Sequence, residues 1–241
     1  MLRLYKIPHP SWSTIIPTRI FVVRHGNVPH HQGDVAILPE GKIAAFKSAS
    51  QIADQMSDSA TVIILHAPTA RTRETAQAIA RGLEAALREQ NKNDARVAPP
   101  QVETAIRNFH FILDGICYPP TDAMHESLPA IAAQNSFLQG FWQSIDDPIG
   151  YWLTHPSPSA ESPATVAQRL LEFFARLLDH PTAEFYILVT HSGPMRAFLR
   201  TVFGADPGEP EYCEMFQVNA SGVYYRHQSQ SIPNTIPISN L

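Results

Sequence analysis

The sequence predicts an α/β fold of three layers (α/β/α), with a mostly parallel, doubly wound sheet and an aromatic-rich insertion. Three apolar, β-branched runs indicate the central strands, because parallel strands that are covered on both faces read as continuous Val, Ile and Leu. Each run ends in a polar stretch that contains histidine, within residues 21–26, 62–68 and 187–193. An open α/β sheet binds its ligand outside the carboxyl ends of its strands, so these polar residues should share one pocket.

Periodic apolar residues predict the other elements in order. The predicted strands cover residues 19–24, 61–65 and 184–190, with a short extended piece near 101–106. The predicted helices cover 41–56, 69–90, a long segment from 163 onward, and 194–203. Ser162 and Pro163 supply an N-cap and a proline at the first helical position, so the third helix should begin there. Gly204 should end the last helix.

Length and composition fit a single domain over residues 1–241, because 44% hydrophobic residues can fill a core. The Pro-rich segment 1–18 is expected to form an N-terminal arm and 228–241 a loose C-terminal tail. Segment 109–152 concentrates aromatic residues and is expected to be an insertion. Such an excursion is either a lid that sets specificity or an extra packing layer.

Charge and cysteine content exclude several classes of protein. The net charge is −4 and there is no run of Lys or Arg, which argues against binding to nucleic acid. No apolar stretch approaches the length needed to cross a bilayer. The only cysteines, Cys117 and Cys213, are far apart and outside any CxxC spacing, so neither a disulfide framework nor a zinc site built on cysteine is indicated. A cytoplasmic protein is therefore expected, and its oligomeric state is not predicted.

The first polar stretch, Arg24-His25-Gly26, contains residue types suited to phosphate chemistry. Glycine lets the backbone approach a ligand closely, and arginine offers a planar fork of donors that matches phosphate oxygens. A neutral imidazole whose second nitrogen is fixed by a hydrogen bond is a competent nucleophile for a phosphoryl group. His25 is therefore a candidate nucleophile.

Arg71 and Arg73 both fall in the first turn of the helix predicted from residue 69. A cation there opposes the helix dipole, unless an anion is bound at the same place. We expect Arg71 to bind phosphate. For Arg73 a surface pair with Glu74 or another nearby acid is the favoured interpretation.

His191 repeats the arrangement at the end of another apolar strand, where Pro194 belongs to the start of the next helix. Backbone N–H groups at such a helix start can point at an anion. The His191 side chain can donate to phosphate and stabilise charge in the transition state.

These stretches together resemble the histidine phosphatase superfamily, which includes the cofactor-dependent phosphoglycerate mutases. Residues 19–27 resemble its Arg-His-Gly nucleophile motif, and 68–76 are similar to its Ser-Pro-Leu-x-Arg-Ala-x-x-Thr-Ala segment. Residues 160–169 resemble its Gly-Glu-Ser to Arg stretch, and 189–193 its second-histidine motif. The match runs in the right order from residue 19 to residue 204.

The resemblance implies a phosphatase that acts on a small phosphate ester, with no metal and no cofactor. It implies that His25 accepts the phosphoryl group and that Arg24, Arg71 and His191 line the phosphate pocket. Val28 stands where the family usually has Thr or Ser, and His31 stands near the position of a frequent Asn. Fewer of the usual side-chain donors to phosphate are therefore present. Asn27 is expected to compensate as a phosphate-binding residue.

The general acid is the largest departure from the family pattern. A positioned acid contributes roughly 10²–10⁴-fold to a rate, and the family supplies it from a Leu-x-Glu segment. Here Glu103 is the candidate if Val102-Glu103 matches that segment. If Ile106-Arg107-Asn108 matches instead, an amide replaces the carboxylate, and Asp114 and Glu126 become rivals to Glu103.

Three alternatives stay open. A phosphoglycerate mutase would need more cations than Arg107, which is the only Lys or Arg in 102–126, so hydrolysis is preferred. A phosphate-binding module without turnover is favoured by Asn108. A zinc hydrolase would need imidazole ligands from the set His25, His30, His31, His66 and His191.

Four aromatic residues of segment 109–152 either line the side of the leaving group or pack in the core: Phe109, Phe111, Trp142 and Trp152.

Overall fold

The computed structural model describes residues 18–121 and 134–232. Its main sheet has eight strands in the order β10-β9-β8-β1-β7-β2-β3, with β4 also paired to β2. At its centre β7 (Phe185–Thr190) lies between β1 (Arg19–Arg24) and β2 (Thr61–His66), parallel to both. Two short strands, β3 (Arg96–Val97) and β4 (Gln101–Val102), pair in parallel with β2.

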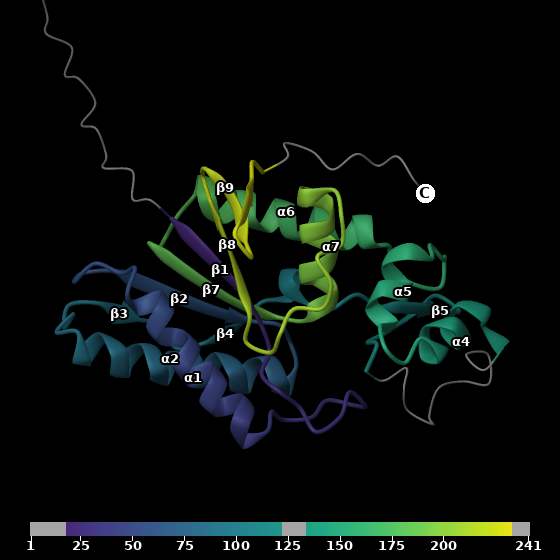
Figure 1. Cartoon of the computed structure of the whole chain (residues 1–241), viewed down its shortest axis with the longest axis horizontal. Coiled ribbons are helices and arrows are strands. Elements are labelled where there is room, and N and C mark those ends of the chain that lie inside the picture. Colours follow the sequence, from purple (N-terminus) through teal and green to yellow (C-terminus); the bar gives the residue numbers. More distant parts are fainter. Residues whose placement is uncertain (1–17, 122–133, 233–241) are drawn as a thin grey trace, which may run out of the picture.

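Helices cover both faces of this sheet (Figure 1). One face carries α1 (Pro39–Ala53) and α2 (Ala70–Glu89), and the other carries α6 (Pro163–Asp179) and α7 (Ser192–Phe203). The molecule has one hydrophobic core on each face of the sheet. Strand β1 contributes to both, because successive side chains of a strand point to opposite faces. The predicted α/β fold with a mostly parallel sheet is confirmed.

The two sides of β1 can be followed residue by residue. Phe21 and Val23 belong to the cluster that contains Ile52 of α1 and Leu83 of α2. The alternate residues of β1 belong to the cluster under α6 and α7. Its members include Ile20, Val22, Leu170, Phe174 and Phe198.

The helix ends follow the predicted signals. Ser162 Oγ accepts a hydrogen bond from the backbone N–H of Thr165 at 3.1 Å, which satisfies one of the free donors at the start of α6. Gly204 follows α7 with φ of 78°, the left-handed conformation that favours glycine at a helix end. The sequence placed the start of α7 at Pro194, but the helix begins at Ser192, directly after His191.

The C-terminal part of the sheet corrects one prediction. Antiparallel strands β8 (Met215–Asn219), β9 (Gly222–Tyr225) and β10 (Gln228–Gln230) extend the sheet beyond β1. The prediction of a loose tail from residue 228 is therefore wrong for β10. Its polar side chains give no strand pattern in the sequence, and backbone pairing with β9 forms the strand. The two-residue turn before it has positive φ at Arg226 and His227, as tight hairpins require.

Residues 1–17 and 233–241 lie outside the described residues, so nearly all of the predicted arm and most of the predicted tail do too. The single-domain division of 1–241 stays a prediction. Within the described residues no helix is both long enough and apolar enough to cross a membrane.

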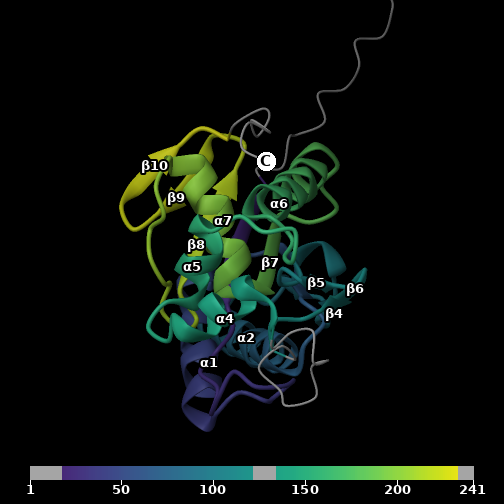
Figure 2. The same ribbon diagram turned by 90° about the vertical axis from the view of Figure 1, so that its right-hand side faces the viewer.

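The segment between the short 3₁₀ helix η1 (Thr104–Ile106) and α6 forms the insertion, and its buried side chains belong to the same hydrophobic cluster as those of α6 and α7. It contains the hairpin of β5 (Phe111–Leu113) and β6 (Ile116–Tyr118), followed by α4 (Ser136–Gln143) and α5 (Pro148–Thr154). Residues 122–133 of it are not described. Figure 2 looks onto this end of the molecule and shows α4 and α5 in front of the sheet. The insertion thus lies over the end of the sheet that carries the histidines.

Candidate active site

His25 and His191 leave adjacent strands side by side. The register of β1 and β7 pairs Arg24 with Thr190, so the residues that follow are neighbours at the carboxyl ends of both strands. The backbone N–H of His25 donates to Thr190 O at 3.0 Å, which extends the pairing by one residue. The two imidazole ring centroids are 5.3 Å apart, and the residues are 3% and 4% exposed.

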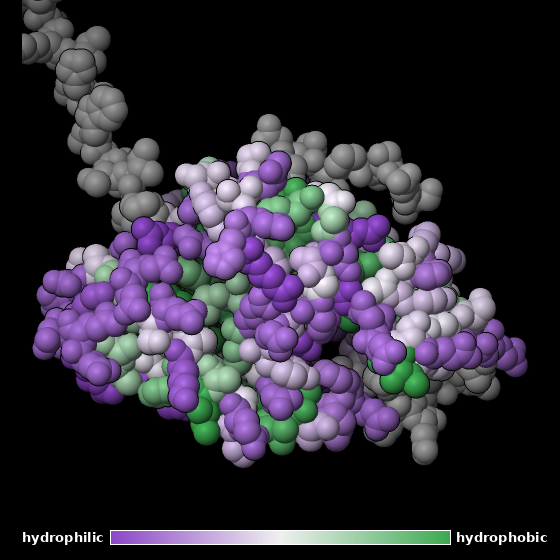
Figure 3. All heavy atoms as spheres, in the orientation of Figure 1, coloured by the Kyte–Doolittle hydropathy of each residue, from purple (hydrophilic) through white to green (hydrophobic). Residues whose placement is uncertain are grey.

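A cavity of about 300 Å³ opens at these two rings. Its inner wall consists of Arg24, His25, Arg71 and His191, and the elements of the insertion form much of its outer wall. In the space-filling view the surface is hollowed between the part that bears the sheet and the part that contains α4 and α5 (Figure 3). The structure therefore brings together two imidazoles and two guanidinium groups that are far apart in the sequence.

The hydrogen bond of His25 sets its tautomer. Nδ1 lies 2.8 Å from Gly26 O, and because a carbonyl oxygen only accepts, Nδ1 carries the proton. Nε2 then holds the lone pair. Burial, followed by the charges of His191, Arg24 and Arg71, lowers the pKa of His25 well below its usual value. A neutral ring with a free Nε2 is the state that a phosphoryl acceptor needs.

Contacts behind His25 hold it against α2. The backbone N–H of Gly26 donates to Thr75 Oγ1 at 2.9 Å, and the same hydroxyl donates to Arg71 O at 2.7 Å. On its other side, a side chain at position 26 would meet the backbone of Gly41 in α1 at 3.0 Å, so the close approach of the loop to α1 favours glycine. The first turn of α2 and the nucleophile loop are thus tied together.

The two arginines reach the cavity from different elements. Arg71 in the first turn of α2 is 1% exposed and donates from Nη2 to Gly33 O. The helix start also meets a carboxylate, because Asp34 Oδ1 accepts from the N–H of Ala70 at 2.7 Å. The negative charge of Asp34 therefore offsets part of the unfavourable interaction between Arg71 and the helix dipole, from which a bound anion was predicted. Arg73 is exposed and Glu74 pairs with Lys42 at 3.0 Å, so Glu74 is not its partner.

Arg24 is held on three sides. Its Nη2 pairs with Glu209 Oε1 at 2.8 Å, its Nη1 donates to Pro210 O, and its guanidinium lies 4.2 Å from the centroid of the Tyr212 ring. The ring of Tyr212 is also 5.9 Å from that of His25. The loop between α7 and β8 thus covers one side of the site. Sequence reasoning missed this loop, because it has no periodic pattern and no motif.

His191 presents a buried nitrogen to the cavity. Among the described residues nothing hydrogen-bonds its Nε2. Burial, then the charges of Arg71 and Arg24, lowers the pKa of His191 to about 3. A neutral ring is expected in the free protein, and a phosphate dianion would raise the pKa of both rings by supplying the opposite charge.

These pKa values predict a loss of stability in mild acid. An imidazole in the unfolded chain titrates at ~6.5. Below that pH His25 and His191 are protonated in the unfolded state but stay neutral in the folded state. The free energy of unfolding should fall by up to about 1.4 kcal/mol per pH unit and per imidazole below pH ~6. Urea titrations at pH 7, 6 and 5 measure it. His191→Asn should flatten the slope, and an unchanged slope would contradict the assignment.

Two sequence-predicted residues lie apart from the cavity. Glu103 Oε1 accepts from the N–H of Ala105 at 2.8 Å and caps η1, and Glu103 is not among the lining residues. Asn27 is also absent from the lining, while its backbone carbonyl accepts from the N–H of Leu38. The rival Asp114 lies in the β5–β6 turn and does not line the cavity, and Glu126 lies outside the described residues.

Other polar residues do line the cavity. Asn108 is one of them, and its Oδ1 accepts from the N–H of Phe109 at 3.0 Å. His31 is another, with its ring centroid 6.5 Å from that of His25 and its Nε2 3.4 Å from the hydroxyl of Tyr212. Burial and the charges of Arg71 and Arg24 lower the pKa of His31. His31 thus adds a third imidazole to the cavity wall, near the position where the family pattern has Asn.

The carboxylates of the cavity wall come from residues that the sequence did not single out: Asp146, Asp147 and Glu209. Arg196 of α7 is fully buried and pairs with Asp147, Asp206 and Glu209. These ion pairs attach the start of α5 to α7.

The imidazole zinc site is not formed. Over residues 18–121 and 134–232 no group of three or more His, Cys, Asp or Glu side chains could hold a metal ion. His66 is used locally, because its Nδ1 lies 2.8 Å from Ala67 O. His30 is exposed.

The aromatic residues of the insertion mostly pack against one another. Phe109 stacks on Trp152 at 4.1 Å between centroids and meets Phe111 edge to face at 5.5 Å. All three are buried and none lines the cavity, nor does Trp142. Of the two alternatives for these four residues, the structure supports packing. Phe141 is the aromatic residue among those that line the cavity.

Comparisons with known proteins give the fold a name. A mycobacterial glucosyl-3-phosphoglycerate phosphatase, solved in complex with VO3, superposes with a TM-score of 0.54 at 18% identity, over 89% of this chain and 95% of its own. The chain has the histidine phosphatase fold. The model of the histidine phosphatase superfamily (branch 1) matches residues 134–234, which include the second-histidine motif but not the Arg-His-Gly motif. The resemblance seen in the motifs is confirmed.

Two further phosphatases of this fold show the same likeness. A phosphoserine phosphatase mutant from Entamoeba histolytica, solved with phosphoserine, gives a TM-score of 0.52 at 14% identity, covering 91% of this chain and 97% of its own. A putative α-ribazole-5′-P phosphatase from Escherichia coli gives 0.52 at 14%, covering 92% and 99%. A search of the curated proteins found no match.

Proposed function

We propose that this chain is a metal-independent phosphomonoesterase that works through a phosphohistidine at His25. The observation that carries the proposal is one cavity in which Arg24, Arg71 and His191 surround the free Nε2 of His25. Two guanidinium groups and an imidazole can hold a tetrahedral dianion and balance the charge that develops as it transfers. The histidine phosphatase fold and the phosphatases that share it support the same reaction class.

The reaction proceeds in two displacements. In the first, Nε2 of His25 forms a bond to phosphorus as the bond from phosphorus to the ester oxygen breaks, and the alcohol leaves as its anion, which takes a proton from solvent water. In the second, water attacks phosphorus, the P–N bond breaks, and inorganic phosphate leaves with His25 neutral again. Arg24, Arg71 and His191 hold the three other oxygens throughout. The bond from Nδ1 to Gly26 O keeps the ring oriented and in one tautomer.

The turnover test uses a phosphate-ester panel with the native protein after exhaustive chelation. Release of inorganic phosphate from an aryl phosphate such as 4-nitrophenyl phosphate is the expected result. Mutase turnover of 3-phosphoglycerate without phosphate release would overturn hydrolysis in favour of transfer between two positions. Loss of turnover on chelation would overturn metal independence.

Asn108 predicts a steep dependence on the leaving group. An amide cannot protonate the departing oxygen, so alkyl phosphates should be much poorer substrates than aryl phosphates. Asn108→Asp is isosteric, keeps an acceptor for the N–H of Phe109 and adds an acid to the cavity wall. We expect it to raise kcat for an alkyl phosphate by roughly 10-fold or more. Initial rates on butyl phosphate and 4-nitrophenyl phosphate measure the two cases. A fall on both would contradict this role.

A phosphate-binding module is the second candidate, and the position of Asn108 in the cavity wall favours it. In that case the arginines bind phosphate and His25 stays idle. Calorimetric titration with vanadate and the ester panel separate the two. Binding of vanadate without turnover of any phosphomonoester supports the module.

A further inference from the structure

The cavity has two walls of different chemistry. The inner wall is basic, with Arg24 and Arg71 beside the two buried imidazoles. The outer wall is apolar and acidic. Its apolar members are Pro120, Phe141, Ile145, Pro148 and Ile149, and its carboxylates are Asp146, Asp147 and Glu209.

The inner wall determines the orientation of a bound phosphate ester. The buried Nε2 of His191, to which no described residue hydrogen-bonds, marks the place of the phosphoryl group. The phosphoryl group therefore lies deep, against His25 and His191, and the alcohol portion extends toward α4 and α5. The outer wall is thus the part of the site that selects among phosphate esters.

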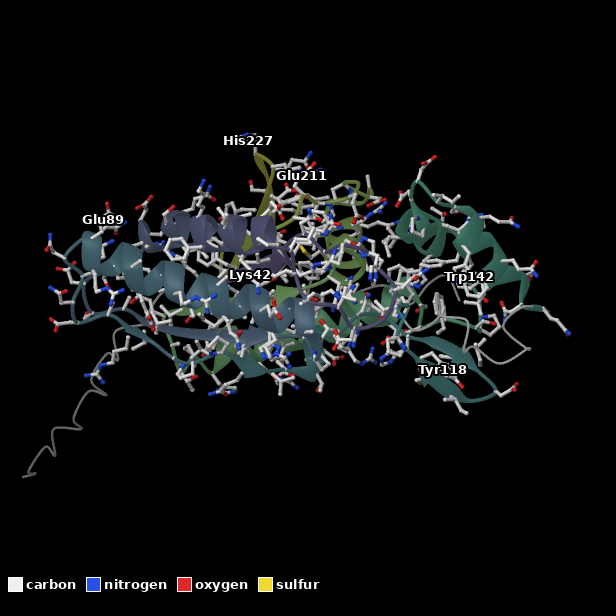
Figure 4. All side chains as sticks on the ribbon, turned by 90° about the horizontal axis from the view of Figure 1, so that it is seen from below. Lys42, Glu89, Tyr118, Trp142, Glu211 and His227 are labelled. Atoms are coloured by element: carbon white, nitrogen blue, oxygen red, sulfur yellow. The ribbon has the colours of Figure 1, made fainter. Side chains whose placement is uncertain are left out.

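The outer wall offers no cation to a second anionic group. Arg24 and Arg71 are the only Lys or Arg side chains among the described residues that line the cavity. Between Arg107 and Arg169 the sequence contains neither Lys nor Arg. Figure 4 shows that the insertion, marked by Tyr118 and Trp142, lies at the opposite end of the molecule from Glu89 at the end of α2. A carboxylate on the alcohol portion would find no ion-pair partner there.

The guanidinium of Arg196, which binds two carboxylates of this wall, is already saturated. Arg196 donates from Nη1 to Asp147 at 2.5 Å and to Glu209 at 3.1 Å, and from Nε to Asp206 at 3.0 Å. Three carboxylates thus share one arginine, with Glu209 also bound to Arg24. The hydrogen bonds from Arg196 keep the pKa of Asp147 below its usual range, so that group stays ionised. The cavity mouth carries excess negative charge.

Asp146 adds a charge that no described residue neutralises. It is exposed, lines the cavity, and has no hydrogen-bond or ion-pair partner among the described residues. Beside it Ile145 is 84% exposed, although it is a large apolar side chain. An unpaired carboxylate next to an exposed apolar side chain suits a ligand that is apolar and cationic at once.

We infer that the site selects phosphate monoesters of an apolar alcohol that bears an ammonium group, and rejects those that bear a carboxylate. The inference rests on the proposed function and names its substrate class. The phosphate binds the basic inner wall, the apolar body packs on Phe141, Ile145 and Ile149, and the ammonium faces Asp146. Carboxylated phosphoesters such as 3-phosphoglycerate meet repulsion at the same place.

The test compares three aryl phosphates of matched size: 4-(2-aminoethyl)phenyl, 4-ethylphenyl and 4-(2-carboxyethyl)phenyl phosphate. The two-carbon spacer keeps the acidity of the leaving phenols similar. We expect kcat/KM to fall in that order, with the ammonium ester at least about tenfold above the carboxylate ester at low salt. Added salt should narrow the ratio, because exposed charges are screened.

Variants of Asp146 assign the effect to this wall. Asp146→Asn should lower the ammonium-to-carboxylate ratio by about fivefold, and Asp146→Lys should bring it to one or below. The matched control is Asp94→Asn, an exposed aspartate beyond the far end of α2, which should leave the ratio unchanged. A ratio near one in the native protein, or one that Asp146→Lys does not move, overturns the inference.

The outcomes also separate this inference from the phosphatase proposal. Equal hydrolysis of all three esters contradicts the selectivity alone. Hydrolysis of none contradicts the phosphatase, and calorimetric binding of the same three esters to the native protein then tests the selectivity. The same order of affinities supports it, and equal affinities overturn it.

Discussion

Replacing His25 with alanine should abolish turnover, with a loss of kcat of at least about 10³-fold. Of the imidazoles that line the cavity, His25 is the one among the described residues whose Nδ1 bonds a backbone carbonyl, Gly26 O, and burial lowers its pKa, so its Nε2 keeps a lone pair for phosphorus. Without Nε2 the phosphoryl group has no acceptor, and direct attack by water is the only remaining route. Release of inorganic phosphate from 4-nitrophenyl phosphate measures the loss.

The matched control for this variant is His30→Ala. His30 is exposed in the loop that follows the nucleophile, and its Nδ1 lies 3.1 Å from Gln32 O. Its removal should leave turnover within about twofold, since exposed substitutions away from special features change little. A His25→Ala protein that keeps a tenth or more of native turnover would rule out His25 as the nucleophile.

Replacing Arg71 with methionine should lower kcat/KM by roughly 10²–10³-fold. The fully buried guanidinium loses its charge, and the phosphoryl dianion loses a charged donor in a place from which water is excluded. Methionine keeps an unbranched side chain of similar length, so packing against α2 changes little. Steady-state kinetics on 4-nitrophenyl phosphate and a vanadate titration measure the two consequences.

Arg73→Met is the control on the same helix. Arg73 lies two residues further on, exposed, and does not line the cavity. We expect native kinetics from it. Equal losses in both variants would point to a nonspecific effect of charge on α2 and contradict a phosphate contact by Arg71. Melting temperatures of both variants show whether either loss comes from unfolding.

The alternation of strand and helix could be predicted because the signals are local. The apolar run of β1 and the helical spacing of α1 and α2 are each visible within a short window. The strands β8 to β10 have no such signal. Their partners are residues of β1 and of each other, so a pairing over a long sequence distance decides them, and the polar residues of β10 read as a tail.

The inner wall of the site could be predicted for the same reason. A histidine that follows a buried parallel strand lies at the carboxyl edge of the sheet, and His25 and His191 both do. Glu103 shows the limit of this reasoning. Its side chain caps the adjacent 3₁₀ turn, a local competition between side chain and backbone that spacing alone does not reveal.

The outer wall could not be predicted, because it depends on how distant segments pack. Glu209 and Tyr212 come from a loop without periodicity, and Asp146 and Asp147 from a turn between two short helices. Arg196 brings these pieces together through ion pairs across the molecule. Only the folded arrangement shows that one arginine serves three carboxylates.

A rapid-quench labelling experiment tests the phosphohistidine most directly. Native protein is mixed with excess aryl phosphate, quenched in base within the first turnover, digested, and mapped by mass spectrometry. Phosphohistidine survives base and is lost in acid, so the expected result is a base-stable, acid-labile phosphate on His25. Turnover with no phosphate on the protein, or with phosphate on another residue, would contradict the account.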